Sequence, residues 1–232
     1  MEVVQFRYNS DNLAYLLVDG DRAVAVDGGA VRDIARYVEE RGLSLVSAFH
    51  THNHADHTAG TVRLCAETGA RLMSRDQLVR AGIVMVGNSV VKVLETPGHT
   101  DDSLCFLAGS NLVSGDTLFN FTVGNCFSGD LDAFYRSVAL LMALPPETVV
   151  WAGHDYVAAS LTFARILSPG NLHIDEMKAK YDPARVCSTI AEELLVNPYM
   201  RFNEPDMVEI LEQKGLARET ALDRFKSVME LY

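Results

Sequence analysis

The sequence has no surplus of basic residues. Its 232 residues include 31 Asp and Glu but only 20 Lys and Arg, which gives a formal net charge of −11 at pH 7. A protein that binds nucleic acid needs a basic face to neutralise phosphates, and no cluster of Lys or Arg provides one here. We therefore expect no nucleic-acid partner.

Long apolar runs are also missing. The first residues, MEVVQFRYNSDN, contain neither the basic start nor the apolar core of a signal peptide. No apolar stretch reaches the length of about 20 residues that a membrane-spanning helix needs. These absences predict a cytoplasmic protein with no membrane partner. The sequence predicts no particular oligomeric state.

Cysteine is scarce. Cys65, Cys105, Cys126 and Cys187 are widely spaced and form no CxxC pair, which argues against a zinc knuckle and against a disulfide framework. We expect small buried thiols instead. The sequence also has no GxSxG nucleophile elbow and no obvious catalytic cysteine.

The composition, with 48% hydrophobic residues, is that of an ordinary globular protein, and its length allows one large domain with a small accessory piece. In the first two thirds, short apolar runs alternate with amphipathic helical patterns, which predicts a mixed α/β domain. The expected strands are 2–6, 13–18, 22–26, 43–49, 89–95, 103–108, 111–114 and 148–152. The expected helices begin after Gly29, after Thr58, near Ser74, at Leu131 and near Asp155.

Beyond the SPGN stretch at 168–171, strand-like runs vanish and helical patterns continue. Thr189 and Glu192 form a capping box for a helix that Asn197 and Pro198 should stop. We therefore predict a main α/β domain at residues 1–170 and a helical extension at residues 171–232.

The histidines are concentrated in one stretch. Of seven in the chain, four lie in FHTHNHADHTAG, at His50, His52, His54 and His57, around Asp56. Three later stretches place a metal-capable side chain directly after a strand and a glycine. These side chains are His99 after Gly98, Asp116 after Gly115 and His154 after Gly153. Glycine permits a sharp turn, and loops at one end of a sheet can converge.

His52, His54, His57, His99 and His154, together with Asp56 and Asp116, therefore offer seven candidate metal ligands. Imidazoles and carboxylates suit zinc and related metals, and a catalytic zinc needs only about three protein ligands. Seven ligands suggest two divalent ions about 3.5–4 Å apart, with an aspartate able to bridge them. Zn²⁺ is the first choice, and Fe or Mn would suit the same donors.

THNHADH matches the THxHxDH motif of the metallo-β-lactamase superfamily, and the three later ligands follow in that family's order. The segments DNLAYLLV, TPGHT, SGDTLF, AGHDY, FARILSPGN and STIAEELLVNPYMR resemble the hydroxyacylglutathione hydrolase (glyoxalase II) branch. The resemblance implies an α/β fold, the αββα sandwich, with the metals at one edge. Residues 1–170 would be the metallohydrolase domain, and residues 171–232 the glyoxalase II-like helical extension.

The resemblance also implies roles for the ligands. One metal would bind His52, His54 and His99, the other would bind Asp56, His57 and His154, and Asp116 would bridge the two. A bridging hydroxide, which Asp56 could help to orient, would hydrolyse a small-molecule acyl thioester such as S-lactoylglutathione to a hydroxy acid and a thiol.

The resemblance also predicts where Asp27 and His50 lie relative to the metal ligands. Asp27 matches an acidic position that the superfamily keeps near the site, where it either shapes the DGG turn or hydrogen-bonds a metal-binding histidine. His50 stands where the branch usually has threonine, so we expect it outside the ligand set.

Substrate contacts are predicted at five positions by the same resemblance. Relatives that act on glutathione thioesters present a basic residue and a tyrosine after the bridging Asp, a tyrosine after the last His, and Arg and Lys in the final helix. This chain has Asn125, Phe127, Tyr156, Asp223 and Lys226 there. Two positions lose a positive charge, which should weaken the binding of the glutathione carboxylates. We therefore hypothesise that the natural thiol differs from glutathione or that glutathione binds weakly.

Other functions stay open. A persulfide dioxygenase of the same superfamily would bind one iron through His52, His99 and Asp116. A nucleic-acid phosphodiesterase is disfavoured by the acidic charge, and a β-lactam hydrolase by the helical tail. A metal-binding domain without catalysis is the remaining alternative.

Overall fold

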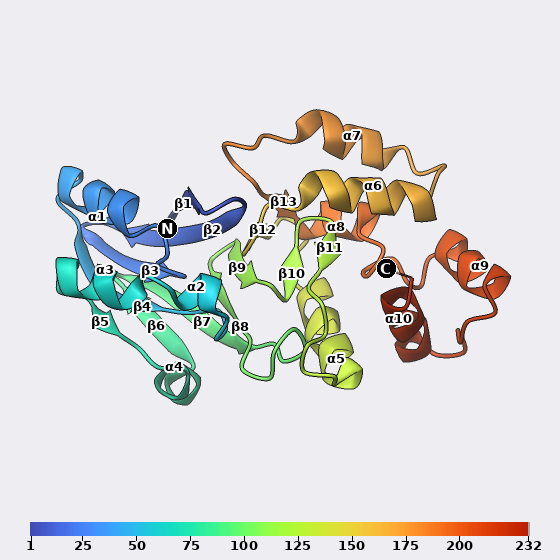
Figure 1. Ribbon diagram of the computed structural model, residues 1–232, viewed down its shortest axis with the longest axis horizontal. Coiled ribbons are helices and arrows are strands. Elements are labelled where there is room, and N and C mark those ends of the chain that lie inside the picture. Colours follow the sequence, from blue (N-terminus) through green and yellow to red (C-terminus); the bar gives the residue numbers. More distant parts are fainter. Residues whose placement is uncertain (232) are drawn as a thin grey trace.

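The computed structural model describes residues 1–231 and shows two β-sheets with helices on their outer sides (Figure 1). The first sheet consists, in spatial order, of β1 (Glu2–Tyr8), β2 (Asn12–Asp19), β3 (Arg22–Val26), β4 (Ser44–Phe49) and β5 (Arg71–Leu72). The second consists of β13 (Ser188–Thr189), β12 (Val149–Ala152), β9 (Asn111–Gly115), β8 (Leu104–Ala108), β7 (Ser89–Glu95) and β6 (Ile83–Val86). A hairpin of β10 (Leu118–Phe119) and β11 (Thr122–Val123) lies next to β9 and β12.

Strand β2 shows how the sheets stack. Its odd-numbered residues from Leu13 to Leu17 face the second sheet and pack with Phe106 and Trp151. Its even-numbered residues point to the opposite side, where they pack with Ile34 of an outer helix. Because successive side chains of a strand alternate between faces, an apolar run buries both faces at once.

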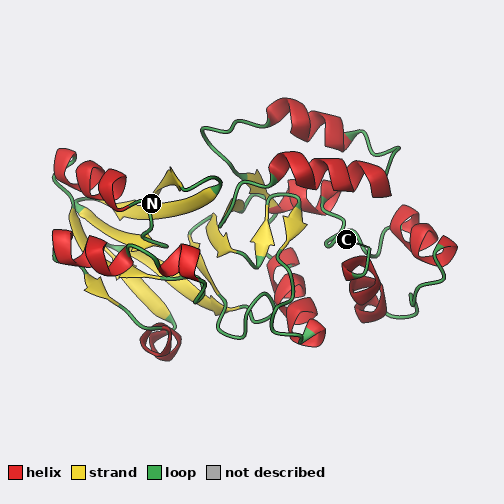
Figure 2. Ribbon diagram, viewed as in Figure 1, coloured by secondary structure: helices red, strands yellow, loops and turns green. Residues whose placement is uncertain are grey.

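Helices form the two outer layers (Figure 2). The first sheet is covered by α1 (Val31–Glu40) and α3 (Thr61–Thr68). The second is covered by α5 (Leu131–Met142), α8 (Ile190–Val196), α9 (Pro205–Gln213) and α10 (Ala221–Met229). The remaining helices of the described residues are α2 (Ala55–Thr58), α4 (Arg75–Ala81), α6 (Val157–Leu167) and α7 (His173–Lys180). This layering confirms the predicted αββα sandwich. None of the helices in residues 1–231 combines the length and apolar composition needed to cross a bilayer.

The C-terminal helices share a core with the sandwich. Leu112 of β9, Phe134 of α5 and Phe225 of α10 belong to one buried cluster, and the rings of Phe134 and Phe225 meet edge to face at 5.9 Å. Helices α8, α9 and α10 therefore belong to the layer on the outer face of the second sheet, whereas α7 packs against α6. The division at residue 170 stays a prediction.

A buried carboxylate ties α8 to the loop after β10. Both oxygens of Glu193 accept a hydrogen bond from the backbone N–H of Phe121, at 3.0 and 2.9 Å, and Oε2 also accepts from Nδ2 of Asn197. Phe121 has a φ of 70°, a left-handed conformation that is costly for an aromatic residue. Burial raises the pKa of Glu193 to about 8, although Ser188, Asn197 and Phe121 all donate to it.

The predicted long strands and helices are present, and two local expectations were wrong. The helix expected after Thr58 is present as α3, which starts at Thr61 after Gly60, whose φ is 91°. Strand structure does not vanish after residue 171, since β13 pairs with β12; a two-residue strand has no periodicity to recognise. All four cysteines are free, but only Cys105 is fully buried. The capping box of α8 is confirmed.

Candidate metal centre

The candidate metal ligands lie at the ends of four strands. They are His52, His54, Asp56 and His57 after β4, His99 after β7, Asp116 after β9 and His154 after β12. Asp56 and His57 lie on α2, a single helical turn whose start turns both side chains back toward the other loops. The structure gathers all seven into two adjoining groups of possible ligands.

Glycines permit the close approach of these loops. Gly115 has a φ of 52°, which places Asp116 after a left-handed turn. At Gly153, an added Cβ would lie 2.1 Å from Oδ1 of Asp116. A side chain at position 153 would therefore occupy the space between the ligand loops.

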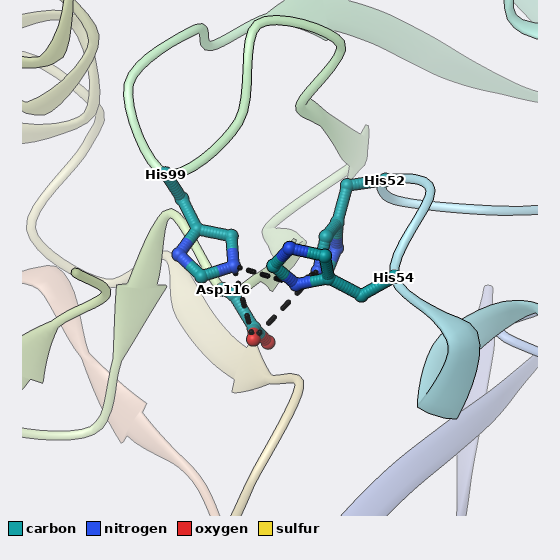
Figure 3. Close-up of side chains that lie close together, drawn as sticks. All are labelled: His52, His54, His99 and Asp116. Atoms are coloured by element: carbon teal, nitrogen blue, oxygen red, sulfur yellow. Dashed lines mark hydrogen bonds and ion pairs between the residues drawn. The ribbon is translucent and has the colours of Figure 1, made fainter. Parts of the chain in front are cut away.

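The first group contains three histidines that point toward one another, with Asp116 beside them (Figure 3). Nδ1 of His54 lies 2.9 Å from Nε2 of His52 and 3.2 Å from Nε2 of His99. Oδ2 of Asp116 lies 3.8 Å from Nε2 of His52 and 3.5 Å from Nε2 of His99. Three ring nitrogens and one carboxylate oxygen thus surround one point.

The second group contains Asp56, His57 and His154. Nε2 of His57 and Nε2 of His154 lie 3.1 Å apart. Oδ2 of Asp56 lies 3.6 Å from Nε2 of His57 and 3.3 Å from Nε2 of His154. Oδ1 of Asp116 lies 3.4 Å from Nε2 of His57. Asp116 therefore has oxygens near both groups, as a bridging ligand requires.

The donors fit metal ions. Two nitrogens bound to one tetrahedral zinc, at about 2.1 Å each, lie about 3.4 Å apart, close to the spacings in both groups. Oδ1 of Asp116 is buried, and in residues 1–231 its only nearby donor is a proton on Nε2 of His57, which lies 3.4 Å away in poor hydrogen-bond geometry. A buried carboxylate oxygen that is so poorly satisfied is costly unless a cation lies beside it.

The charges around His57 also favour a cation. Burial alone would lower the pKa of His57, but the charges of Asp27 and Asp116 and their hydrogen bonds raise it to about 11. Burial alone would raise the pKa of Asp116, yet the hydrogen bond and charge of His57 hold it at about 2. A metal ion beside these residues would supply the positive charge that a proton on His57 otherwise provides.

The first group differs in its protonation. Burial lowers the pKa of His52 to about 4, and burial also lowers the pKa of His99. Both imidazoles are therefore neutral near pH 7, and the neutral ring is the form that binds a metal.

Asp27 lies directly behind the second group. Its Oδ2 is 3.0 Å from Nδ1 of His57 and accepts a hydrogen bond from the hydroxyl of Thr51 at 2.7 Å, while its Oδ1 accepts one from the backbone N–H of Thr51 at 2.8 Å. Of the two expected places, the structure thus puts Asp27 against a candidate ligand. Its role in metal binding stays a prediction.

The first hairpin contributes residues that sequence reasoning missed. Oδ1 of Asp11 lies 2.7 Å from Nδ1 of His154, Nδ2 of Asn12 donates to Oδ2 of Asp56 at 2.9 Å, and the hydroxyl of Tyr8 donates to the carbonyl of Asp56. A polar turn between two strands is an ordinary pattern, so nothing in SDN pointed to this contact.

His50 belongs to neither group. Its ring is half-buried, burial lowers its pKa, and its Nε2 has no hydrogen-bond partner in the part of the chain that the structure describes. Its place outside the ligand set stays a prediction.

A cavity of about 230 Å³ opens beside the second group. Asn125, Tyr156 and Phe119 line it, together with residues of β11, α6 and α10. The Tyr156 ring stacks on His154 at 5.0 Å with 6° between the planes, and Phe119 meets both rings edge-on. Two predicted substrate contacts therefore line one cavity that adjoins the ligands.

The other predicted contacts lie elsewhere. Phe127 is 65% exposed, and its ring meets the edges of His54 and His99 at 5.7 and 5.3 Å. Nζ of Lys226 lies 2.6 Å from Oδ1 of Asp132. Asp223 caps α10 by accepting hydrogen bonds from the backbone and hydroxyl of Thr220.

Known proteins resemble this chain over most of its length. Residues 155–231 match the family described as "Hydroxyacylglutathione hydrolase C-terminus". The hydroxyacylglutathione hydrolase of Chromohalobacter salexigens is 34% identical over 225 residues, which cover 88% of each chain. ETHE1 from Myxococcus xanthus has a crystal structure that is 30% identical, with a TM-score of 0.69, covering 99% of this chain and 90% of that one.

A metallo-β-lactamase from Staphylococcus aureus shares the fold at 22% identity, with a TM-score of 0.67, covering all of this chain and 71% of that one. The fold, the C-terminal family match and the full-length relatives agree. The chain belongs to the hydroxyacylglutathione hydrolase family and has the metallo-β-lactamase fold.

Proposed function

We propose that this chain hydrolyses small-molecule acyl thioesters, such as S-lactoylglutathione, with a pair of divalent metal ions, Zn²⁺ being the first choice. The observation that carries the proposal is the convergence of seven donors into two groups around one shared carboxylate, that of Asp116. The family name of the relatives supports the same reaction.

In this proposal His52, His54 and His99 hold one metal, Asp56, His57 and His154 hold the other, and Asp116 serves both. A bound metal pair supplies Lewis-acid chemistry, because it acidifies water toward neutral pH and withdraws charge from a carbonyl oxygen. The residues themselves need carry no nucleophile, in agreement with the missing GxSxG elbow.

The cavity beside His154 provides the place for the thiol part of the substrate. Tyr156 and Phe119 form an aromatic wall directly against the second group, so a substrate held there has its thioester next to the ligands. The thiolate needs no protein acid to leave, because a thiol ionises far more readily than an alcohol.

The charges around this cavity support a weak or altered preference for glutathione. Asn125 offers a neutral amide at the cavity, Asp223 is engaged in capping α10, and Lys226 is paired with Asp132. A carboxylate-bearing thiol would therefore find no strong cationic partner among these predicted contacts.

The test is a thioester panel measured alongside metal content. Purified protein should contain close to two metal ions per chain and should hydrolyse acyl thioesters, with no strong preference for lactoylglutathione over thioesters of other thiols. Protein with two metals but no thioesterase activity would contradict the proposed reaction. A strong preference for the glutathione substrate would contradict the altered carrier alone.

The iron persulfide dioxygenase needs only His52, His99 and Asp116. The second group of ligands would then have no part in the chemistry, so the geometry favours hydrolysis. Oxygen uptake with glutathione persulfide, measured on iron-loaded protein, separates the two reactions.

A further inference from the structure

The turn between β1 and β2 brings one edge of the first sheet against the loop that carries His154. The backbone N–H of Leu13 donates to the carbonyl of Gly153 at 2.8 Å, and the N–H of Asp155 donates to the carbonyl of Asp11 at 2.9 Å. These backbone bonds fix the turn beside His154 independently of the side chain at position 11.

From this position Asp11 contacts the back of a candidate ligand. Its Oδ1 lies 2.7 Å from Nδ1 of His154, while Nε2 of the same ring faces Asp56 and His57. A carboxylate that accepts the Nδ1 proton fixes the orientation and the tautomer of the ring and leaves the Nε2 lone pair free for a metal ion.

The two groups of ligands differ in this respect. In the first group, Nδ1 of His99 faces the backbone carbonyl of Asn125 at 2.9 Å, and Nδ1 of His52 faces the hydroxyl of Thr51 at 3.1 Å, both neutral partners. In the second group, both histidines have a carboxylate behind them, Asp27 for His57 and Asp11 for His154.

We propose that Asp11 is a positioning residue for the second metal ion, which acts by orienting the His154 ring and fixing its tautomer. Its loss therefore weakens the second metal selectively and leaves the first bound. The inference rests on the proposed metal pair and goes beyond it, because it assigns a function to a residue outside the ligand set.

The surroundings of Asp11 suit a role at the second metal site rather than in the stability of the fold. The Asp11 side chain is 34% exposed, so its removal creates no buried cavity, and its remaining oxygen accepts only from Oγ of Ser10 among the hydrogen bonds found in residues 1–231. Asn12 supports the same metal site from the adjacent position, since its amide holds Oδ2 of Asp56.

The test is a Zn²⁺ competition titration against a chelator of known affinity, with zinc counted per chain. The variants are Asp11→Ala and Asp11→Asn, and the matched control is Asp21→Asn, an exposed acid in the neighbouring turn. For Asp11→Ala we expect the affinity for the second zinc to fall about 10- to 100-fold and that for the first to stay unchanged. Asp11→Asn should lose less of the affinity for the second zinc, because the amide oxygen can still accept a hydrogen bond from Nδ1 of His154.

Two double variants show which metal ion is affected. In a protein that already carries His154→Ala, Asp11→Ala should cause no further loss of zinc affinity, because the second site has already lost that ring. In a protein that carries His99→Ala, Asp11→Ala should still weaken zinc binding at the second site. The melting temperature of metal-free Asp11→Ala protein should match that of metal-free Asp21→Asn protein. A merely structural role of Asp11 would lower the melting temperature of Asp11→Ala.

If Asp11→Ala lost equal affinity for both zinc ions, or kept wild-type affinity for both, the role of Asp11 would be overturned while the metal pair would stand. A wild-type chain that binds only one zinc would overturn the metal pair, and the inference with it.

Discussion

Oδ2 of Asp27 lies 3.0 Å from Nδ1 of His57, and both side chains are almost completely buried. The contact joins the end of the third strand to the helical turn that carries the ligand, and two hydrogen bonds that Thr51 donates to Asp27 hold the same loop. One carboxylate therefore fixes both the loop and the ring.

Asp27→Asn should weaken metal binding about 10- to 100-fold at the second site. The left-handed backbone at this position, with a φ of 56°, tolerates Asn as well as Asp, so the fold should persist. The amide keeps an acceptor for Thr51 but no longer carries the charge that favours a cation at His57. Zinc titration is the measurement, with Asp33→Asn on the exposed face of α1 as the control; unchanged affinity would count against the role of Asp27.

His57→Ala and His50→Ala should have unequal effects. Removing His57 deletes a donor of the second group, so thioesterase activity should fall by more than about 100-fold, beyond the effect of a residue that only orients a ligand. His50→Ala should keep both metals and most activity, because His50 belongs to neither group. Metal content and kcat/KM of the two variants decide the matter, and equal losses would refute the asymmetry.

Glu193 should make stability depend on pH. Its carboxyl has a pKa of about 8 in the folded chain and an ordinary value of 4.5, so the folded chain binds more protons between these values. Its favourable contribution to the free energy of unfolding is complete below pH 4.5 and is lost as the pH rises through 8. At about 1.4 kcal/mol per pKa unit, this loss amounts to a few kcal/mol. Urea denaturation of metal-free protein from pH 5 to 9 measures this decline.

Glu193→Gln cannot ionise and should make the decline less steep, leaving the part that the raised pKa of His57 causes, whereas Glu209→Gln, on the exposed side of α9, should keep the full decline. The same slope in wild type and Glu193→Gln would show that another group titrates.

Asn125→Arg should improve hydrolysis of lactoylglutathione. A guanidinium at this exposed edge of the cavity gives a glutathione carboxylate a cationic partner, and exposed ion pairs correspond to about 2- to 5-fold in affinity. The change should appear as a lower KM with kcat unchanged. A thioester without carboxylates in its thiol part serves as the control substrate, and an equal gain on that substrate would argue against charge recognition.

Sequence patterns predicted the long strands and all seven candidate ligands, because each pattern is local, whereas the sandwich was implied by the family resemblance. Strand β2 alternates its buried faces over consecutive residues, and His99 directly follows a strand and a turn. The contacts of Asp11, Asn12 and Glu193 could not be predicted in this way. They join segments more than about 40 residues apart, and the residues themselves have ordinary turn or helix surroundings.

The bond between Glu193 and the loop at Phe121 also bears on synthesis. Chains grow at roughly 5–20 residues per second, and a domain generally folds as a unit. All seven donors are present once His154 has been added, but the carboxylate that holds the loop next to Phe119 is added later. A ribosome-bound chain that ends between His154 and Glu193 therefore has every metal donor but lacks the group that fastens the wall of its cavity.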